Sequence, residues 1–85
     1  IEGGLIFGLA AAVGATTDYS GGLAEARKLG QLGLPRLSHC PEITVELIDS
    51  DREPGGIGEL AVPVVAPAIA NALAAATGRR IRRLP

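Results

Sequence analysis

The chain has 85 residues, a formal net charge of -1 and a hydrophobic fraction of 47%, with one Phe, one Tyr and no Trp. A chain of this length can form one small domain at most, and its core must be aliphatic and closely packed or completed by other segments. Its single cysteine, Cys40, excludes an internal disulfide and any cysteine-based zinc or iron–sulfur site within these residues. The longest apolar stretch, residues 60–76, is interrupted by two prolines and one asparagine, so we expect no membrane helix.

Neither end of the chain resembles a natural terminus. The chain begins at Ile1 rather than Met and ends at Pro85, directly after four arginines, Arg79, Arg80, Arg82 and Arg83. We therefore expect a piece of a longer polypeptide. The arginines are half of the eight basic residues, and no aromatic side chains accompany them. We expect this tail to be solvated or to lie at a helix C-terminus, and not to bind nucleic acid.

The first predicted element is a buried helix over residues 5–13, a stretch that has no polar residue. Glycine in a helix costs about 1 kcal/mol relative to alanine, so Gly3, Gly4 and Gly8 require a compensating contact. We expect these glycines to allow the close approach of another backbone. Gly14 is predicted as the C-cap of the helix.

A β-hairpin and an irregular connection are predicted next. Residues 15–19 and 23–26 fit two short strands, and residues 20–22 form the glycine-rich turn between them. In residues 27–41, isolated leucines lie among glycines and prolines, which favours a loop.

A strand and a second helix complete the predicted elements. Residues 43–48 alternate between apolar and polar and are rich in β-branched side chains, which predicts a strand with one buried face. Residues 64–77 are predicted as a helix with a proline near its start and Gly78 as its C-cap. Arg79 and Arg80 then lie at the negative end of its dipole. Helix, hairpin, strand and helix together indicate a compact α+β fold.

The most informative stretch, residues 53–59 (EPGGIGE), lies between the last predicted strand and the last predicted helix. Its three glycines leave the main chain free to pass close to a ligand or cofactor, and Glu59 presents one carboxylate that can act as a general base. A second interpretation stays open. In that interpretation the stretch is a tight turn, and the carboxylate lies near a helix N-terminus, where it contributes about 0.3 to 1 kcal/mol.

Two other patterns are weaker. His39 and Cys40 can suggest a metal site or a nucleophile pair, but neighbours in an extended segment tend to point apart and no further ligands are spaced nearby. Asp49, Asp51 and Glu53 alternate as in a calcium loop, but the glycine and distal glutamate of an EF-hand are missing. A solvated acidic loop is the better interpretation of these three residues.

Five blocks of sequence, in order along nearly the whole chain, together resemble a known family. The blocks are residues 1–9 (IEGGLIFGL), 54–59 (PGGIGE), 62–63 (VP), 66–72 (APAIANA) and 76–82 (ATGRRIR). They are similar to the closing segment of isoquinoline 1-oxidoreductase-type large subunits, in the xanthine dehydrogenase and aldehyde oxidase family. The resemblance implies that residues 1–85 form the C-terminal part of a molybdopterin-binding domain, which the rest of the large subunit completes.

The same resemblance implies roles for the glycine-rich stretch. It implies that Glu59 stands beside the molybdenum as the general base. It also implies that Gly55, Gly56, Ile57 and Gly58 lay their main chain against a molybdopterin-type molybdenum cofactor, expected in its cytosine dinucleotide form. The implied parent is a molybdenum hydroxylase that uses water-derived oxygen to hydroxylate an aldehyde or an N-heterocycle and passes electrons to 2Fe-2S clusters in a small partner subunit.

Two positions depart from the family pattern. Leu60 follows Glu59 where many relatives have proline, and residues 29–35 lack the aromatic residues often found there. These departures concern the shape of the substrate pocket and the size of the substrate. From the residues alone, an alternative stays open: a small stand-alone α+β interaction module without catalytic activity, which docks through its Gly/Ala-rich helices and its arginine tail.

Overall fold

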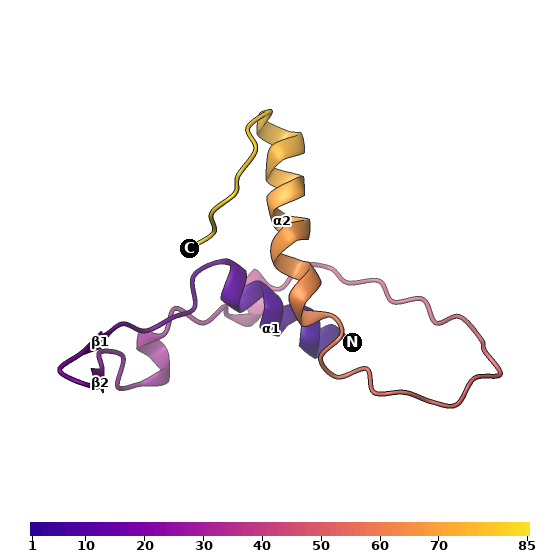
Figure 1. Cartoon of the computed structure of the whole chain (residues 1–85), viewed down its shortest axis with the longest axis horizontal. Helices are drawn as coiled ribbons and strands as arrows, with labels where there is room; N and C mark the ends of the chain where they lie inside the picture. Colours follow the sequence, from indigo (N-terminus) through magenta and orange to yellow (C-terminus); the bar gives the residue numbers. More distant parts are fainter.

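A computed structural model describes all 85 residues of the chain. The elements are two α-helices, α1 (Glu2–Ala12) and α2 (Val62–Thr77), two strands, β1 (Tyr19–Ser20) and β2 (Leu23–Ala24), and two 3-10 helices, η1 (Leu29–Gln31) and η2 (Leu37–His39). The two α-helices cross at the centre, the hairpin lies at one end and a long loop extends from the other (Figure 1). The predicted α+β class is confirmed.

The first helix, α1, begins at Glu2, earlier than predicted, and a carboxylate in the first turn is favourable to the helix dipole. The helix ends at Ala12 and its C-cap is Val13. The predicted cap, Gly14, is the next residue and has the left-handed φ of 101° that reverses the chain. The N–H of Ala15 then donates to the carbonyl of Ala10 at 2.9 Å, which closes the helix end.

The predicted hairpin is confirmed, although its strands are shorter than expected. Ser20 pairs with Leu23, and Gly21 and Gly22 form the turn between them with φ values of 57° and 78°. A two-residue turn with φ positive at both positions matches the twist of paired strands, and glycine adopts it without steric cost. Beyond the strands, the N–H of Glu25 donates to the carbonyl of Asp18 at 2.8 Å, and the N–H of Ala26 donates to Oγ1 of Thr17 at 2.9 Å. The predicted loop over residues 27–41 is irregular apart from η1 and η2.

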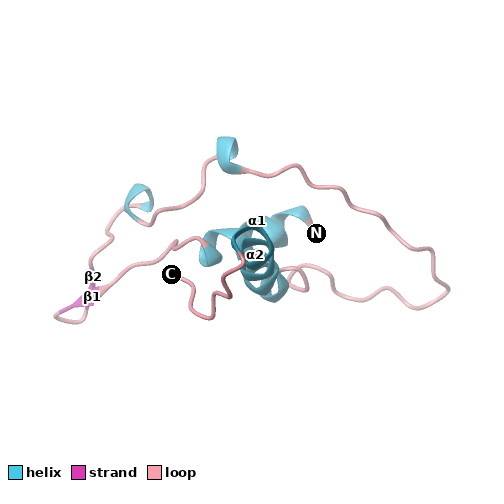
Figure 2. Ribbon diagram, turned by 90° about the horizontal axis from the view of Figure 1, so that it is seen from above, coloured by secondary structure: helices cyan, strands magenta, loops and turns pink.

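The predicted strand over residues 43–48 is wrong. This segment belongs to the long loop that runs from η2 to α2 and crosses no other strand (Figure 2). A strand requires a neighbouring strand to pair with its N–H and C=O groups. The hairpin lies at the opposite end of the molecule (Figure 2), so residues 43–48 have no strand to pair with. Of its apolar side chains, Val45 is 38% exposed and Leu47 is 79% exposed.

The second helix, α2, confirms the prediction with a different start. It begins at Val62, so that Pro63 takes the first-turn position where a missing N–H costs little, and Pro67, the proline expected near the start, lies inside the helix. The predicted C-cap is right, since Gly78 has a left-handed φ of 70° and its N–H donates to Ala74 O at 2.9 Å. The arginines do not reach the last carbonyls, and instead Arg80 donates to Oδ1 of Asn71 at 3.0 Å. Neither helix is both long and apolar enough to cross a membrane.

The contact between α1 and α2 is made through glycine. A Cβ atom added at Gly8 would lie 2.6 Å from the carbonyl oxygen of Val62, and one added at Gly4 would lie 3.0 Å from the carbonyl oxygen of Gly58. The predicted close approach of another backbone is therefore right for these two glycines. It is wrong for Gly3, which has nothing within 4 Å of such a Cβ.

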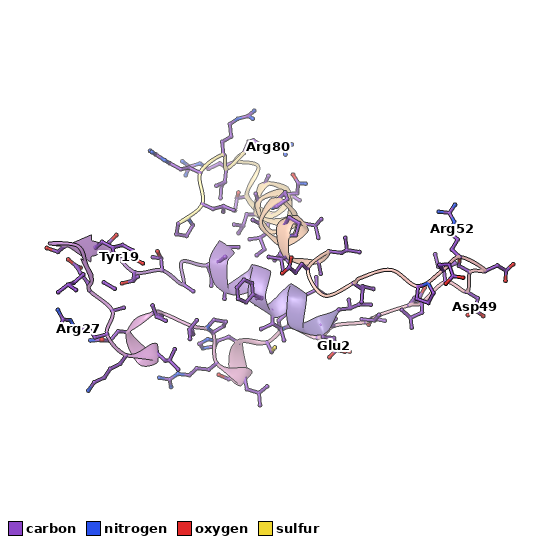
Figure 3. The ribbon with its side chains drawn as sticks, turned by 60° about the horizontal axis from the view of Figure 1, so that its bottom comes forward. Glu2, Tyr19, Arg27, Asp49, Arg52 and Arg80 are labelled. Carbon is purple, nitrogen blue, oxygen red and sulfur yellow. The ribbon has the colours of Figure 1, made fainter.

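The chain is more open than the compact arrangement expected from its sequence, and the prediction of a buried helix over residues 5–13 is wrong, since Phe7 is 70% exposed. Only Gly8 and Ala12 are buried, and the radius of gyration is 16.0 Å, compared with about 12 Å for a compact domain of this length. The accessible surface is 7370 Å², compared with about 4,700 Å² for a compact protein of this mass. The long loop explains much of this large surface, because it extends away from the helices. Figure 3 shows Asp49 and Arg52 at its far end.

Candidate functional site

The glycine-rich stretch and the start of α1 together form a pocket at the point where the loop enters α2. The pocket has a volume of about 560 Å³ and is lined by residues from α1 and from the turn at the start of α2, namely Gly3, Gly4, Phe7, Gly58, Glu59, Val62 and Pro63. Glu59 is the only charged residue among them. A pocket of this size is within the range of sites that bind small molecules.

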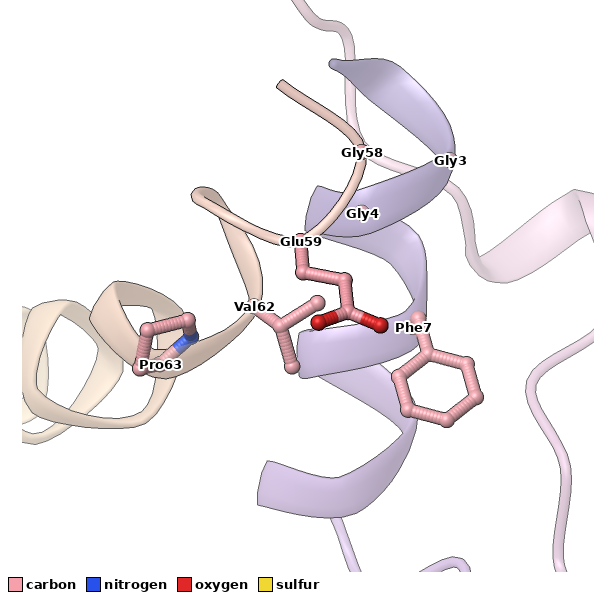
Figure 4. A pocket seen from close by; sticks show the side chains of 7 residues that line it. All are labelled: Gly3, Gly4, Phe7, Gly58, Glu59, Val62 and Pro63. Atoms are coloured by element: carbon pink, nitrogen blue, oxygen red, sulfur yellow. The ribbon is translucent and has the colours of Figure 1, made fainter. Parts of the chain in front are cut away.

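The carboxylate of Glu59 points past Val62 toward the ring of Phe7 (Figure 4). The turn that carries it is tied to α2 by the N–H of Val62, which donates to the carbonyl of Glu59 at 3.1 Å. The side chain itself is exposed, and it does not cap α2, because the N-cap residue is Ala61 and no side chain makes a capping hydrogen bond. Glu59 thus makes no capping hydrogen bond, but it lies in a tight turn directly before the N-terminus of α2, as the second interpretation expected, and its carboxylate has no hydrogen-bond partner in the chain.

The three glycines before Glu59 have no structural purpose within this chain. None of Gly55, Gly56 and Gly58 has a positive φ, and none has an atom within 4 Å of an added Cβ. Neither backbone conformation nor packing inside the chain therefore requires glycine at these positions. The N–H groups of residues 55–58 also donate no main-chain hydrogen bond. This stretch presents N–H groups without a main-chain partner, and three of its four residues have no side chain, which fits the close approach of a cofactor rich in hydrogen-bond acceptors.

The structure brings together only some of the predicted site residues. Gly58 and Glu59 line the main pocket, and Gly56 joins them in a second hollow of about 500 Å³ beside the same turn. Gly55 and Ile57 line neither hollow.

Sequence reasoning did not place Phe7, Val62 and Pro63 in the site. The spacing of Gly4 and Gly8, one helical turn apart, was the available signal, because it marks the face of α1 that meets the loop.

The weaker candidates form no site. Nδ1 of His39 accepts a hydrogen bond from the N–H of Arg36 at 3.3 Å, and Cys40 is a free, half-buried thiol. No group of three or more His, Cys, Asp or Glu residues is placed to hold a metal ion, and this includes the acidic residues of the long loop.

The chain is similar to part of two larger proteins. It is 34% identical, over its whole length, to the isoquinoline 1-oxidoreductase subunit beta of Brevundimonas diminuta, and it spans 11% of that protein. It is also 34% identical, over 99% of its length, to a membrane-bound aldehyde dehydrogenase (pyrroloquinoline-quinone) of Gluconacetobacter polyoxogenes, of which it again spans 11%. No model of a protein family matches the chain, and no solved structure matches it.

Both relatives are oxidoreductases by name, and one of them is named as a subunit. The predicted resemblance to isoquinoline 1-oxidoreductase is supported at this level. The placement in the xanthine dehydrogenase family stays a prediction.

Proposed function

We propose that this chain is part of the large subunit of a molybdenum hydroxylase, in which Glu59 is the general base for the oxidation of an aldehyde or an N-heterocycle. The two relatives support the oxidoreductase class, since their names specify isoquinoline and aldehyde oxidation. The sequence resemblance supports the narrower assignment to a molybdenum enzyme. The observation that carries the proposal is the free carboxylate of Glu59, which lies at the end of a stretch of unobstructed main chain and faces a pocket of about 560 Å³.

The cofactor would lie against the main chain of Gly55, Gly56, Ile57 and Gly58. A molybdopterin-type cofactor, in its cytosine dinucleotide form, supplies two-electron redox chemistry when bound. The N–H groups of these residues have no partner in the chain and can donate to its phosphate or pterin oxygens. The absence of side chains at the three glycines allows this approach.

Residues of the chain would accept the proton and bind the substrate. Glu59 takes a proton from the water-derived oxygen that attacks the substrate, a role that requires the carboxylate within hydrogen-bond reach of that oxygen. Phe7, Val62 and Pro63 provide apolar surface against which an aldehyde or a flat heterocycle can pack. The 2Fe-2S clusters that the resemblance implies in a small partner subunit would accept the electrons.

The exposed apolar surface supports a larger parent. Leu37 is 90% exposed, Ile48 is 94% exposed and Phe7 is 70% exposed, and a soluble domain rarely leaves so many large apolar side chains in water. The remainder of the large subunit would cover these side chains. The same exposure argues against the alternative of a stand-alone interaction module, which would need a core of its own.

The test is Glu59→Gln in the full-length protein, with Glu53→Gln as its matched control. Glu53 lies at the other end of the same stretch and lines neither hollow. We expect Glu59→Gln to lower turnover by about 10² to 10⁴, the range for loss of a general base, with molybdenum content unchanged. The control should keep normal turnover. Near-normal turnover of Glu59→Gln at full cofactor loading would refute the assignment.

The name of the second relative raises pyrroloquinoline quinone as the other candidate cofactor. Metal analysis of the purified full-length protein separates the two. We expect about one molybdenum per large subunit, and a protein that contains the quinone and no molybdenum would overturn the choice of cofactor while leaving the oxidoreductase class intact.

A further inference from the structure

Two glycines of α1 contact the segment that carries Glu59, one on each side of it. Gly4 lies against the carbonyl oxygen of Gly58, the residue before Glu59, at 3.0 Å from the position of an added Cβ. Gly8 lies against the carbonyl oxygen of Val62, three residues after Glu59, at 2.6 Å. The two glycines are one helical turn apart, so a single face of α1 meets both ends of the turn.

The turn has little else to hold it in place. Before it, residues 55–58 donate no main-chain hydrogen bond, and the turn itself has the single bond from Val62 N–H to Glu59 O, at 3.1 Å. That bond fixes Glu59 relative to α2. The position of Glu59 relative to the pocket wall on α1, which includes Phe7, depends on the contacts at Gly4 and Gly8.

We infer that Gly4 and Gly8 are positioning residues for Glu59, and that they set where its carboxylate lies in the pocket. This inference rests on the proposed function of Glu59. A methyl group at Gly4 would push the Gly58 carbonyl by a few tenths of an ångström, since the separation is 3.0 Å. At Gly8 the methyl group would overlap main chain at 2.6 Å and also Cγ2 of Val65 at 2.8 Å, so the start of α2 must move further. A displacement of about 1 Å at a reacting group can lower a rate by about 100-fold.

The test compares Gly4→Ala and Gly8→Ala with Gly30→Ala in the full-length protein. Gly30 is a matched control because it has no positive φ, an added Cβ there meets nothing within 4 Å, and it lines neither hollow beside Glu59. Per bound cofactor, we expect kcat to fall by roughly 3- to 10-fold for Gly4→Ala and roughly 10- to 100-fold for Gly8→Ala, with KM changed less than about twofold. The control should keep kcat within about twofold of the unsubstituted protein.

A double-mutant cycle shows whether the effect passes through Glu59. In the Glu59→Gln background, measured in single-turnover experiments, we expect Gly8→Ala to lower the residual rate by less than about twofold, because the group that it displaces no longer acts. An equal loss in both backgrounds would show a general structural effect and overturn the inference.

A second readout does not depend on catalysis. In the cofactor-free protein, we expect the amide of Val62, whose N–H makes the one main-chain hydrogen bond of the turn, to exchange with deuterium at least about fivefold faster in Gly4→Ala and Gly8→Ala than in Gly30→Ala. Equal exchange in all three variants would show that α1 does not hold the turn. If Glu59→Gln alone left turnover normal, the proposed function would fail, but the exchange result would still decide whether these glycines hold the segment.

Discussion

Residues 1–85, produced without any other part of the protein, should not unfold as one cooperative unit. The unfolded chain would expose about 12,500 Å², so reaching the observed 7370 Å² hides about 5,100 Å². A compact domain of this mass would hide about 7,800 Å². Because the urea dependence of the unfolding free energy scales with the area exposed, its slope should be at most about two-thirds of that for a compact domain.

The assay is circular dichroism at 222 nm during urea titration, together with a dye that fluoresces on exposed apolar surface. The helical signal comes from the 11 residues of α1 and the 16 residues of α2. We expect a gradual loss of signal and strong dye binding before any urea is added. As a control, the same segment in the full-length protein should be protected from hydrogen exchange and should not bind the dye. A single sigmoidal transition with the full slope of a compact domain, without dye binding, would refute the reasoning.

Two further predictions concern glycines with left-handed φ. Gly78→Ala should make the amides of the last turn of α2 exchange about 5- to 30-fold faster in the full-length protein, because alanine at the φ of 70° that Gly78 adopts costs about 1 to 2 kcal/mol. The same amides should exchange more slowly in Gly78→Asn than in Gly78→Ala, and equal rates in the two variants would contradict this explanation. In the hairpin, Gly21→Asn should keep the pairing of Tyr19 with Ala24, whereas Gly22→Val should abolish it, as measured by the exchange protection of the neighbouring Glu25 N–H, which donates to the carbonyl of Asp18 at 2.8 Å.

Local patterns predicted the helices and the hairpin well, because each depends on contacts between residues close in sequence. The unbroken aliphatic run of α1, the double glycine at Gly21 and Gly22 and the helix stop at Gly78 each act within a few residues. The strand predicted over residues 43–48 failed for the opposite reason. Its pattern describes a segment that requires a neighbouring strand, and these 85 residues supply none beside it.

The candidate site was also predicted only in part from the sequence. The glycine-rich run and its terminal carboxylate were visible in residues 55–59, since an unusual local composition marks a main chain kept free of side chains. The packing of α1 on α2 decided two further features of the site. Glu59 faces Phe7, and Gly4 and Gly8 contact the two ends of the turn that carries Glu59. Such contacts join residues more than fifty positions apart in the chain, and only packing in three dimensions selects which of them meet.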